Sequence, residues 1–219
     1  MKGFTPEGWH TSADSGPKKY SVAELLNAME NREILEATAY MCDSDHNLLV
    51  NLGEIKGVIP RIEGAIGVEE GYTRDIAIIS RVGKRVCFTV EEISEIKGEK
   101  PYALLSRRNA QRLCRKGFID RLTAGDVIDA KVTHLESFGA FCDIGCGNVA
   151  LLPIDSISVS RISHPSDRFC TGDDLRVIVK SIDSAGRITL SHKELLGTWQ
   201  ENADRIEQGQ TVSGVVRSV

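Results

Sequence analysis

An internal repeat is the feature that most constrains the fold of this chain. The segments RLTAGDVIDAKVTHL and RIEQGQTVSGVVRSV begin at Arg121 and Arg205, which are 205 − 121 = 84 residues apart. A more diverged copy precedes both, because ILEATAYM from Ile34 resembles VIDAKVTH from Val127, and VGKRVCFTVEEI from Val82 resembles TGDDLRVIVKSI. A repeat of this kind divides the chain into similar small domains.

Each copy consists of short runs rich in β-branched residues, separated by Gly, Asp and Ser. This pattern is typical of a small all-β barrel or sandwich. The last copy stops at Val219, within its first strand. A lone strand cannot bury its apolar face, so we expect either that the sequence is part of a longer protein or that this strand pairs elsewhere.

Helices are predicted around the barrels. SVAELLNAME opens with a capping box from Ser21 to Glu24, TWQENADRI has the same pattern from Thr198 to Glu201, and SRRNAQRLCRKG separates the first two copies. The predicted boundaries are a flexible leader at 1–19, an N-terminal helix at 20–31, a first barrel at 32–105, a basic linker helix at 106–120, a second barrel at 121–195, a spacer helix at 196–206 and the first strand of a third copy at 207–219.

Composition narrows the class of protein. The sequence has no apolar run long enough to cross a membrane, and its start lacks the apolar segment of a signal peptide. Six cysteines without a CxxC pair favour reduced, buried thiols, so we expect a cytoplasmic protein. A net charge of −4 argues against histone-like binding of nucleic acid, although a local basic groove is compatible with it.

The stretch SFGAFCDIG places two phenylalanines, Phe138 and Phe141, three residues apart. Positions i and i+3 of a regular strand point to opposite faces. The alternation after Phe141 predicts Cys142 inside and Asp143 on the solvent face together with Phe141. A bulge at Gly139 would bring both rings onto the outer face. The alternative is that the two rings pack in the core or against a neighbouring strand.

The second copy resembles a known family. The segments GDVIDAKVTHLESFGAF, LLP and GDDLRVIVKSIDSAGRITLSHK, across residues 121–193, resemble the S1-type RNA-binding domain of bacterial ribosomal protein S1, and the first copy fits more loosely over about residues 32–109. The resemblance implies tandem five-stranded antiparallel barrels of the oligonucleotide-binding (OB) type. It also implies that Phe138 and Phe141 stack on successive bases of single-stranded RNA, at roughly 1–3 kcal/mol per base.

Further contacts follow from the resemblance. Asp183 and Arg187 match family positions beside the bound strand, where arginine can contact a phosphate or a base and aspartate can accept from an amine or ribose hydroxyl. The same segment, IDSAGR, also reads as a hairpin turn with Gly186 at positive φ, in which Asp183 and Arg187 simply pair with each other.

The loop after the third strand of the second copy departs from the family. Family members usually carry an RNA-contacting histidine where this chain reads ALLPID, with Pro153 at that position. His164 could replace the histidine, with Arg161 and Arg168 as phosphate contacts. The competing interpretation is that these are ordinary loop residues.

The first copy lacks the residues of the RNA face, and has in their places Asp45, Leu49, Ser94 and Tyr102. By analogy with the leading copies of ribosomal protein S1, we expect it to contact protein, with the small ribosomal subunit as the candidate partner. Because the second copy has more acidic than basic residues, the linker helix could assist RNA binding through Arg108 and Arg112. Alternatively, that helix is a solvated linker.

The sequence contains no phosphate-binding loop, no HExxH and no GxSxG. We therefore predict no catalytic residue, metal, cofactor or small-molecule substrate. The favoured hypothesis is non-catalytic binding of single-stranded RNA, mRNA above all, during translation. The alternatives are a protein-interaction module that docks on the ribosome and an accessory fragment of an RNA-processing enzyme.

Overall fold

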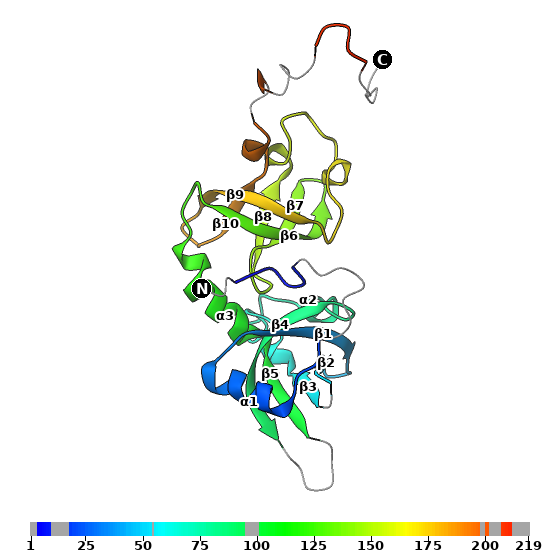
Figure 1. Cartoon of the computed structure of the whole chain (residues 1–219), viewed down its shortest axis with the longest axis vertical. Helices are drawn as coiled ribbons and strands as arrows, with labels where there is room; N and C mark the ends of the chain where they lie inside the picture. The colour runs from blue at the N-terminus through cyan, green and yellow to red at the C-terminus, as the bar shows by residue number, and fades with distance from the viewer. Residues whose placement is uncertain are drawn as a thin grey trace.

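The structure is a computed structural model that describes residues 4–9, 18–53, 55–94, 101–197, 200–201 and 207–211. Two β-barrels lie one above the other along the long axis, with helix α3 (Arg107–Gly117) beside their junction (Figure 1). Residues 4–9 run between the two barrels. We call these residues the N-terminal strap.

The first barrel has five strands: β1 (Leu35–Cys42), β2 (Leu48–Asn51), β3 (Lys56–Ile59), β4 (Arg85–Ser94) and β5 (Tyr102–Ser106). They close in the order β1-β2-β3-β5-β4. Neighbouring strands are antiparallel, except for the parallel pair β3 and β5. The inward side chains, among them Leu48, Phe88 and Leu105, are fully buried and fill the barrel.

The second barrel repeats this arrangement with β6 (Val127–Glu136), β7 (Gly139–Asp143), β8 (Val149–Pro153), β9 (Asp174–Ile182) and β10 (Ile188–Ser191). Its strands close as β6-β7-β8-β10-β9, which is the same order as in the first barrel. The pair β8 and β10 is parallel. The prediction of two five-stranded all-β barrels of the OB type is therefore confirmed, with one parallel pair in each barrel instead of wholly antiparallel strands.

The capping box predicted at the first helix is confirmed. Helix α1 (Val22–Asn31) begins after Ser21, whose hydroxyl accepts from the backbone N–H of Glu24 at 3.3 Å, while the Glu24 carboxylate accepts from the Ser21 N–H at 2.7 Å. A short helix, α2 (Ile76–Ile79), lies between β3 and β4 and was not predicted. Single 3-10 turns cover Arg61–Glu63, Ile119–Arg121, Ile154–Ser156, Pro165–Asp167 and Lys193–Leu196.

The prediction of a flexible leader is wrong for the strap. Phe4 stacks on Phe118 with ring centroids 6.4 Å apart, and Glu7 is buried at the junction. The Gly and Pro content of this segment does specify irregular backbone, but one apolar and one charged side chain have partners that are distant in sequence. Thr198, which starts the second predicted capping box, and residues 212–219 lie outside the described residues.

All six cysteines are free thiols, as predicted from their spacing. Cys87, Cys114, Cys142 and Cys146 are buried, but Cys170 is exposed on the loop before β9, contrary to the expectation of buried thiols. Within the part of the chain that the structure describes, no helix is long and apolar enough to span a membrane.

Candidate nucleic-acid interface

The structure brings Phe138 and Phe141 together at the hairpin between β6 and β7. Phe138 lies in the two-residue turn between Glu136 and Gly139, and Phe141 lies at the centre of β7. Their ring centroids are 6.0 Å apart, with the rings at 88° in an edge-to-face pair. Phe138 is 54% exposed, and Phe141 is half-buried. The pair therefore offers ring surface to a flat partner from the outer face of the barrel.

The bulge that brings the rings together is not at Gly139, contrary to the prediction. The register shift lies on the neighbouring strand, between Val132 and His134, and β7 pairs with β8 without interruption. Phe138 can join Phe141 because it lies in the turn, where strand alternation does not apply. Gly139 has a different purpose: a Cβ there would lie 2.5 Å from the backbone oxygen of Leu152, so the close approach of β8 requires glycine.

His134 is a candidate that sequence reasoning did not single out. It pairs with Phe141 across the two strands, and cross-strand partners point to the same face. Its side chain is 64% exposed, and its Nε2 lies 2.8 Å from the Glu136 carboxylate. The signal was hidden because the shift between Val132 and His134 reverses the alternation of β6 at this point.

Asp183 and Arg187 form the hairpin turn that was one of the two interpretations of their segment. Gly186 has φ +72°, and the Asp183 carboxylate accepts from the backbone N–H groups of Ala185 and Arg187, each at 2.9 Å. Arg187 Nε donates to Asp183 Oδ2 at 2.7 Å, and these bonds lower the pKa of Asp183. Since the Arg187 side chain remains 83% exposed, most of its guanidinium is still available to a ligand.

The three candidates between β8 and β9 lie in a loop with its own polar contacts. His164 precedes the turn Pro165–Asp167, and its ring Nδ1 accepts from the Ser166 N–H at 3.2 Å. Arg168 Nη2 donates to Ser160 Oγ at 2.8 Å, and Arg161 is exposed. Pro153 pairs with Gly139 directly beside the Phe138 turn. The polar group that the family usually has is therefore missing next to the rings.

The arginines of α3 differ in how far they are neutralised. Arg108 forms ion pairs with Glu63 and Glu69, and its side chain is only 12% exposed. Arg112 is half-exposed, with Glu70 at 3.8 Å. The carboxylates of the first barrel thus offset the two charges proposed as phosphate contacts. The side chain of Arg115, one turn further on, has no ion pair or hydrogen bond among the described residues.

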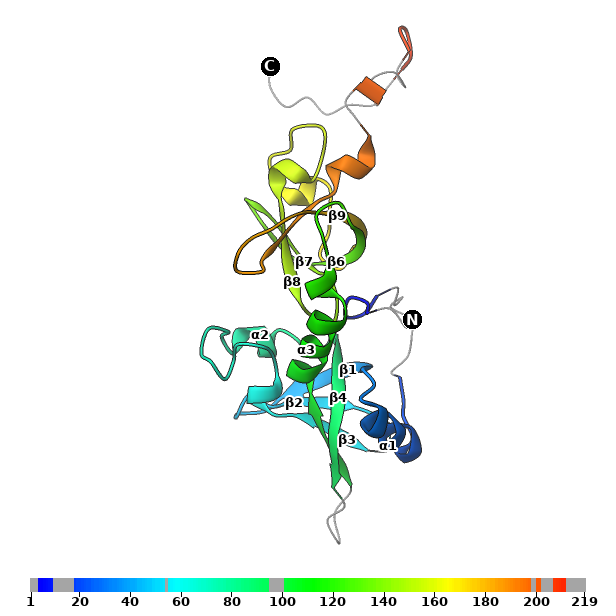
Figure 2. The same ribbon diagram turned by 90° about the vertical axis from the view of Figure 1, so that its left-hand side faces the viewer.

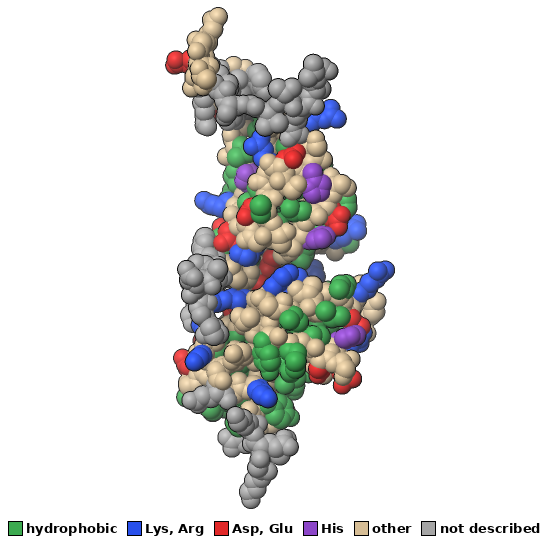
Figure 3. All heavy atoms as spheres, turned by 90° about the vertical axis from the view of Figure 1, so that its right-hand side faces the viewer, with side chains coloured by type: hydrophobic (Ala, Val, Ile, Leu, Met, Phe, Trp, Pro, Cys, Tyr) green, Lys and Arg blue, Asp and Glu red, His purple; other side chains and the backbone are tan. Residues whose placement is uncertain are grey.

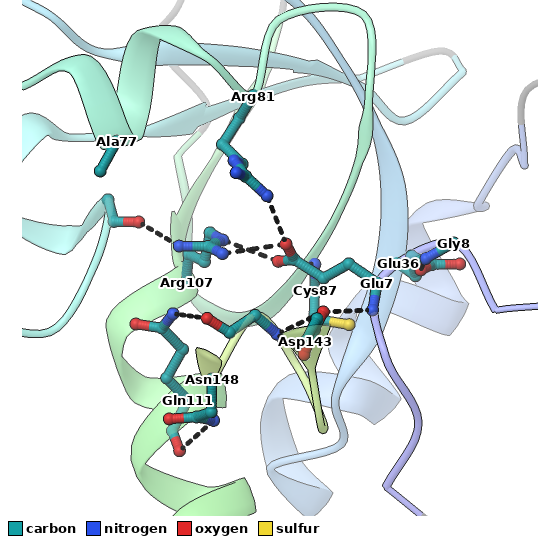
Figure 4. A network of polar contacts seen from close by, with 12 residues as sticks. Glu7, Gly8, Glu36, Ala77, Arg81, Cys87, Arg107, Gln111, Asp143 and Asn148 are labelled. Atoms are coloured by element: carbon teal, nitrogen blue, oxygen red, sulfur yellow. Dashed lines mark hydrogen bonds and ion pairs between the residues drawn. The ribbon is translucent and has the colours of Figure 1, made fainter. Parts of the chain in front are cut away.

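A buried polar network next to this face was not foreseen. Asp143, predicted on the solvent face, is only 2% exposed because the strap and α3 cover the end of β7. Its carboxylate accepts from the N–H groups of Glu7, Gly145 and Gly147 at 2.7–3.0 Å (Figure 4). Burial and the charge of Glu7 raise the pKa of Asp143 to about 7, against the lowering effect of these N–H groups and of Arg107.

Glu7 and Arg107 are at the centre of this network. Arg107 Nε and Nη2 donate to the two oxygens of the Glu7 carboxylate at 2.7 and 2.9 Å, and Arg81 lies 3.5 Å away. Burial acts to raise the pKa of Glu7, but Arg107 and Arg81 outweigh it and hold that pKa below its usual value. A Cβ at Gly147 would lie 2.0 Å from Arg107 Nη2, so glycine is required there.

Gln111 joins the two barrels directly. Its side-chain oxygen accepts from the N–H of Ile66 in the first barrel at 2.8 Å, and its nitrogen donates to the carbonyl of Gly147 in the second at 2.9 Å. The strap, α3 and the loop between β7 and β8 therefore fix the two barrels to each other. Because Phe141 is two residues from Asp143, the aromatic pair lies at the edge of this junction.

Comparison with known proteins agrees with this architecture. The family model described as S1 RNA binding domain matches residues 121–193. The small ribosomal subunit protein bS1 of Staphylococcus aureus (strain COL) is 31% identical over 205 residues, and the bS1 homolog of Bacillus subtilis (strain 168) is 31% identical over 200 residues. These alignments cover 91% and 89% of this chain. They cover 49% of each relative, so the chain spans about half the length of the curated relatives it matches.

Among solved structures, the solution structure of GSP13 from Bacillus subtilis is 22% identical, with a TM-score of 0.34, and covers 42% of this chain and 66% of that chain. The strand order of each barrel, the position of the aromatic pair and the family match over residues 121–193 all agree. Residues 121–193 therefore form an S1 RNA binding domain.

Proposed function

We propose that this chain binds single-stranded RNA, without catalysis, by stacking bases on Phe138 and Phe141. One observation carries the proposal: two phenylalanine rings lie 6.0 Å apart on the outer face of an S1 barrel, and one of them is more than half exposed. Exposing a large apolar ring to water has a cost, and a stacked base removes that cost. Every base has a face to stack, so we expect weak sequence preference.

The relatives support a role in translation. They are named as proteins of the small ribosomal subunit, and mRNA is the single strand that such a role supplies. A cytoplasmic location follows from this proposal. Asp183 and Arg187 are proposed to position the strand, because the exposed Arg187 guanidinium lies at the same groove as Phe141. His164, Arg161 and Arg168 remain candidate contacts in the loop.

The test is fluorescence anisotropy of a labelled single-stranded RNA of about ten nucleotides. We expect Phe138→Ala/Phe141→Ala to weaken binding by about 2 kcal/mol or more, which is roughly 30-fold, while the salt dependence stays the same because the phosphate contacts remain. The matched control is Tyr72→Ala, which removes a 69% exposed ring from the first barrel. Equal loss in both variants, or no loss in either, contradicts stacking on the phenylalanine pair.

A second function is favoured for the first barrel. Tyr40 and Met41, at the end of β1, are 45% and 46% exposed, and Ile76 on α2 is 64% exposed. Figure 3 shows apolar side chains gathered on this barrel. We propose that these side chains dock on a protein of the small ribosomal subunit. Sedimentation with purified small subunits tests this: Tyr40→Ser/Met41→Ser should reduce co-sedimentation while the affinity for free RNA is retained.

A further inference from the structure

A groove connects the phenylalanine pair with the first barrel. It encloses about 620 Å³ and has three walls: the second barrel, helix α3 and the connection between β3 and β4 of the first barrel. In Figure 2 the hairpin between β9 and β10 and helix α2 lie on the same side of α3, one above the other. Figure 3 shows the hollow between the barrels, with basic side chains along it.

The groove is continuous with the proposed RNA face. Phe141 and Arg187 line it, and so does Val149, which is 54% exposed at the start of β8. Phe141 is followed two residues later by Asp143, where the junction begins. An RNA strand that runs from the aromatic pair toward Asp143 therefore reaches the junction without crossing a wall of the groove.

The charge of the groove is one-sided. Four arginines and no Asp, Glu or Lys are among its lining residues, although the whole chain has a net charge of −4. Arg107 makes two hydrogen bonds to Glu7, and Arg81 lies 3.5 Å from the same carboxylate, with the buried Asp143 carboxylate also near both arginines. The Nε of Arg81 is buried and has no hydrogen-bond partner among the described residues.

Arg115 is the side chain best placed to bind an anion. It has no acidic partner among the described residues, and its guanidinium lies beside the turn that carries Arg187, because a Cβ built on Gly186 would be 3.8 Å from Arg115 Nη2. Two guanidinium groups thus border the groove, one from α3 and one from the turn between β9 and β10. Opposite them are small and apolar side chains of the first barrel, including Ile66 and Ala77. Alternating positive and apolar surface suits phosphates and base faces.

We propose that a single RNA strand stacked on Phe138 and Phe141 continues through this groove, with Arg115 binding a phosphate and Ala77 and Thr73 of the first barrel forming its far wall. The inference rests on the proposed function, since it extends the same RNA beyond the second barrel. In this proposal the first barrel contacts RNA through the connection between β3 and β4. It does not use the face around β2, which corresponds to the RNA face of the second barrel.

The test compares two labelled RNAs, one of about 4 nucleotides that covers the aromatic pair and one of about 12 that also fills the groove. In the whole chain, Arg115→Gln should weaken the longer RNA about fivefold or more and reduce the slope of log K against log salt by about 0.7, while the short RNA binds as in the wild type. The matched control is Lys116→Gln, the next residue of α3, which is exposed and does not line the groove.

A second variant tests the far wall. Ala77→Glu places a carboxylate in the groove from the first barrel, and Ile79→Glu places one on the same short helix outside the lining. We expect only Ala77→Glu to weaken the longer RNA. If Arg115→Gln and Ala77→Glu behave like their controls, the groove path is wrong while the aromatic site stands. If the wild type binds neither RNA, both the proposed function and the groove path are wrong.

Discussion

In the first barrel β1 shifts its register with β2 between Ala39 and Met41, and in the second barrel β6 does the same between Val132 and His134. This shared shift makes Leu49 and Phe141 equivalent positions. Leu49 pairs with Met41 and Phe141 pairs with His134, and each partner directly follows the extra residue of its strand. The comparison continues at the other hairpin, where Tyr102 pairs with Ser94 as Arg187 does with Asp183. The two barrels therefore share a backbone plan and differ in which side chains their outer faces carry.

The difference extends to the turns. The β6–β7 turn has two residues and projects Phe138, whereas the corresponding turn of the first barrel runs from Asp43 to Asn47 and is closed by its own polar groups. The Asp43 carboxylate accepts from the N–H groups of Asp45 and Asn47. An aromatic platform depends on a short hairpin as much as on the aromatic residue itself. A substitution in the first barrel alone cannot recreate it.

The largest expected effect concerns what joins the barrels. Arg107→Ala leaves the Glu7 carboxylate, at 7% exposure, with Arg81 as its remaining cation, and removal of one partner from a buried ion pair costs about 3–5 kcal/mol. We expect the free energy of unfolding in urea to fall by that order and the two barrels to unfold separately. Arg112→Ala, on the same helix but half-exposed, should change it by less than about 0.5 kcal/mol. A single cooperative transition of unchanged midpoint in Arg107→Ala contradicts this role.

An exchange of equivalent residues tests the comparison at the RNA face. Phe141→Leu gives the second barrel the residue of the first, retains apolar packing and should weaken RNA binding by about 1–3 kcal/mol in an anisotropy titration. The reciprocal change, Leu49→Phe, should leave affinity unchanged because Asp45 and the longer turn remain. If Leu49→Phe increases affinity as much as Phe141→Leu lowers it, turn length is not the deciding difference.

The last expected effect is a dependence of stability on pH. Burial and Glu7 raise the pKa of Asp143 to about 7, above its unfolded value, so the folded state binds a proton more readily than the unfolded chain. The free energy of unfolding should therefore fall as pH rises from about 4 to about 7, and then level off. Asn51 holds the equivalent position in the first barrel, so Asp143→Asn makes the barrels alike and should abolish this slope. Urea titrations at several pH values measure it.

The sequence predicts the barrels well because the patterns that specify them lie within short segments and recur in each copy. Alternating apolar residues, turn glycines and the matching of Ser94 and Tyr102 with Asp183 and Arg187 all survive in the structure. Phe138 and Phe141 were correctly placed together, although the bulge lies at Thr133 and not at Gly139.

The junction could not be predicted because its partners are far apart in sequence. Alternation in β7 correctly predicts that the Asp143 side chain points away from the barrel core. It does not reveal that the strap covers this side chain and buries it. No periodicity relates Glu7 to Arg107, and nothing in the α3 sequence distinguishes the paired Arg108 from the unpaired Arg115. Such contacts depend on how the two barrels meet, which each repeat alone does not encode.

The strap also imposes an order on folding during synthesis. Glu7 meets Cys87, 80 residues later, then Arg107, 100 residues later, and finally its backbone N–H meets Asp143, 136 residues later. At about 5–20 residues per second, the first barrel can close seconds before the last of these partners leaves the ribosome. Until then the backbone N–H of Glu7 lacks its partner in the second barrel. The strap residues are thus made before all of these partners but reach their final position only after Asp143 has been made, and their docking requires that both barrels are complete.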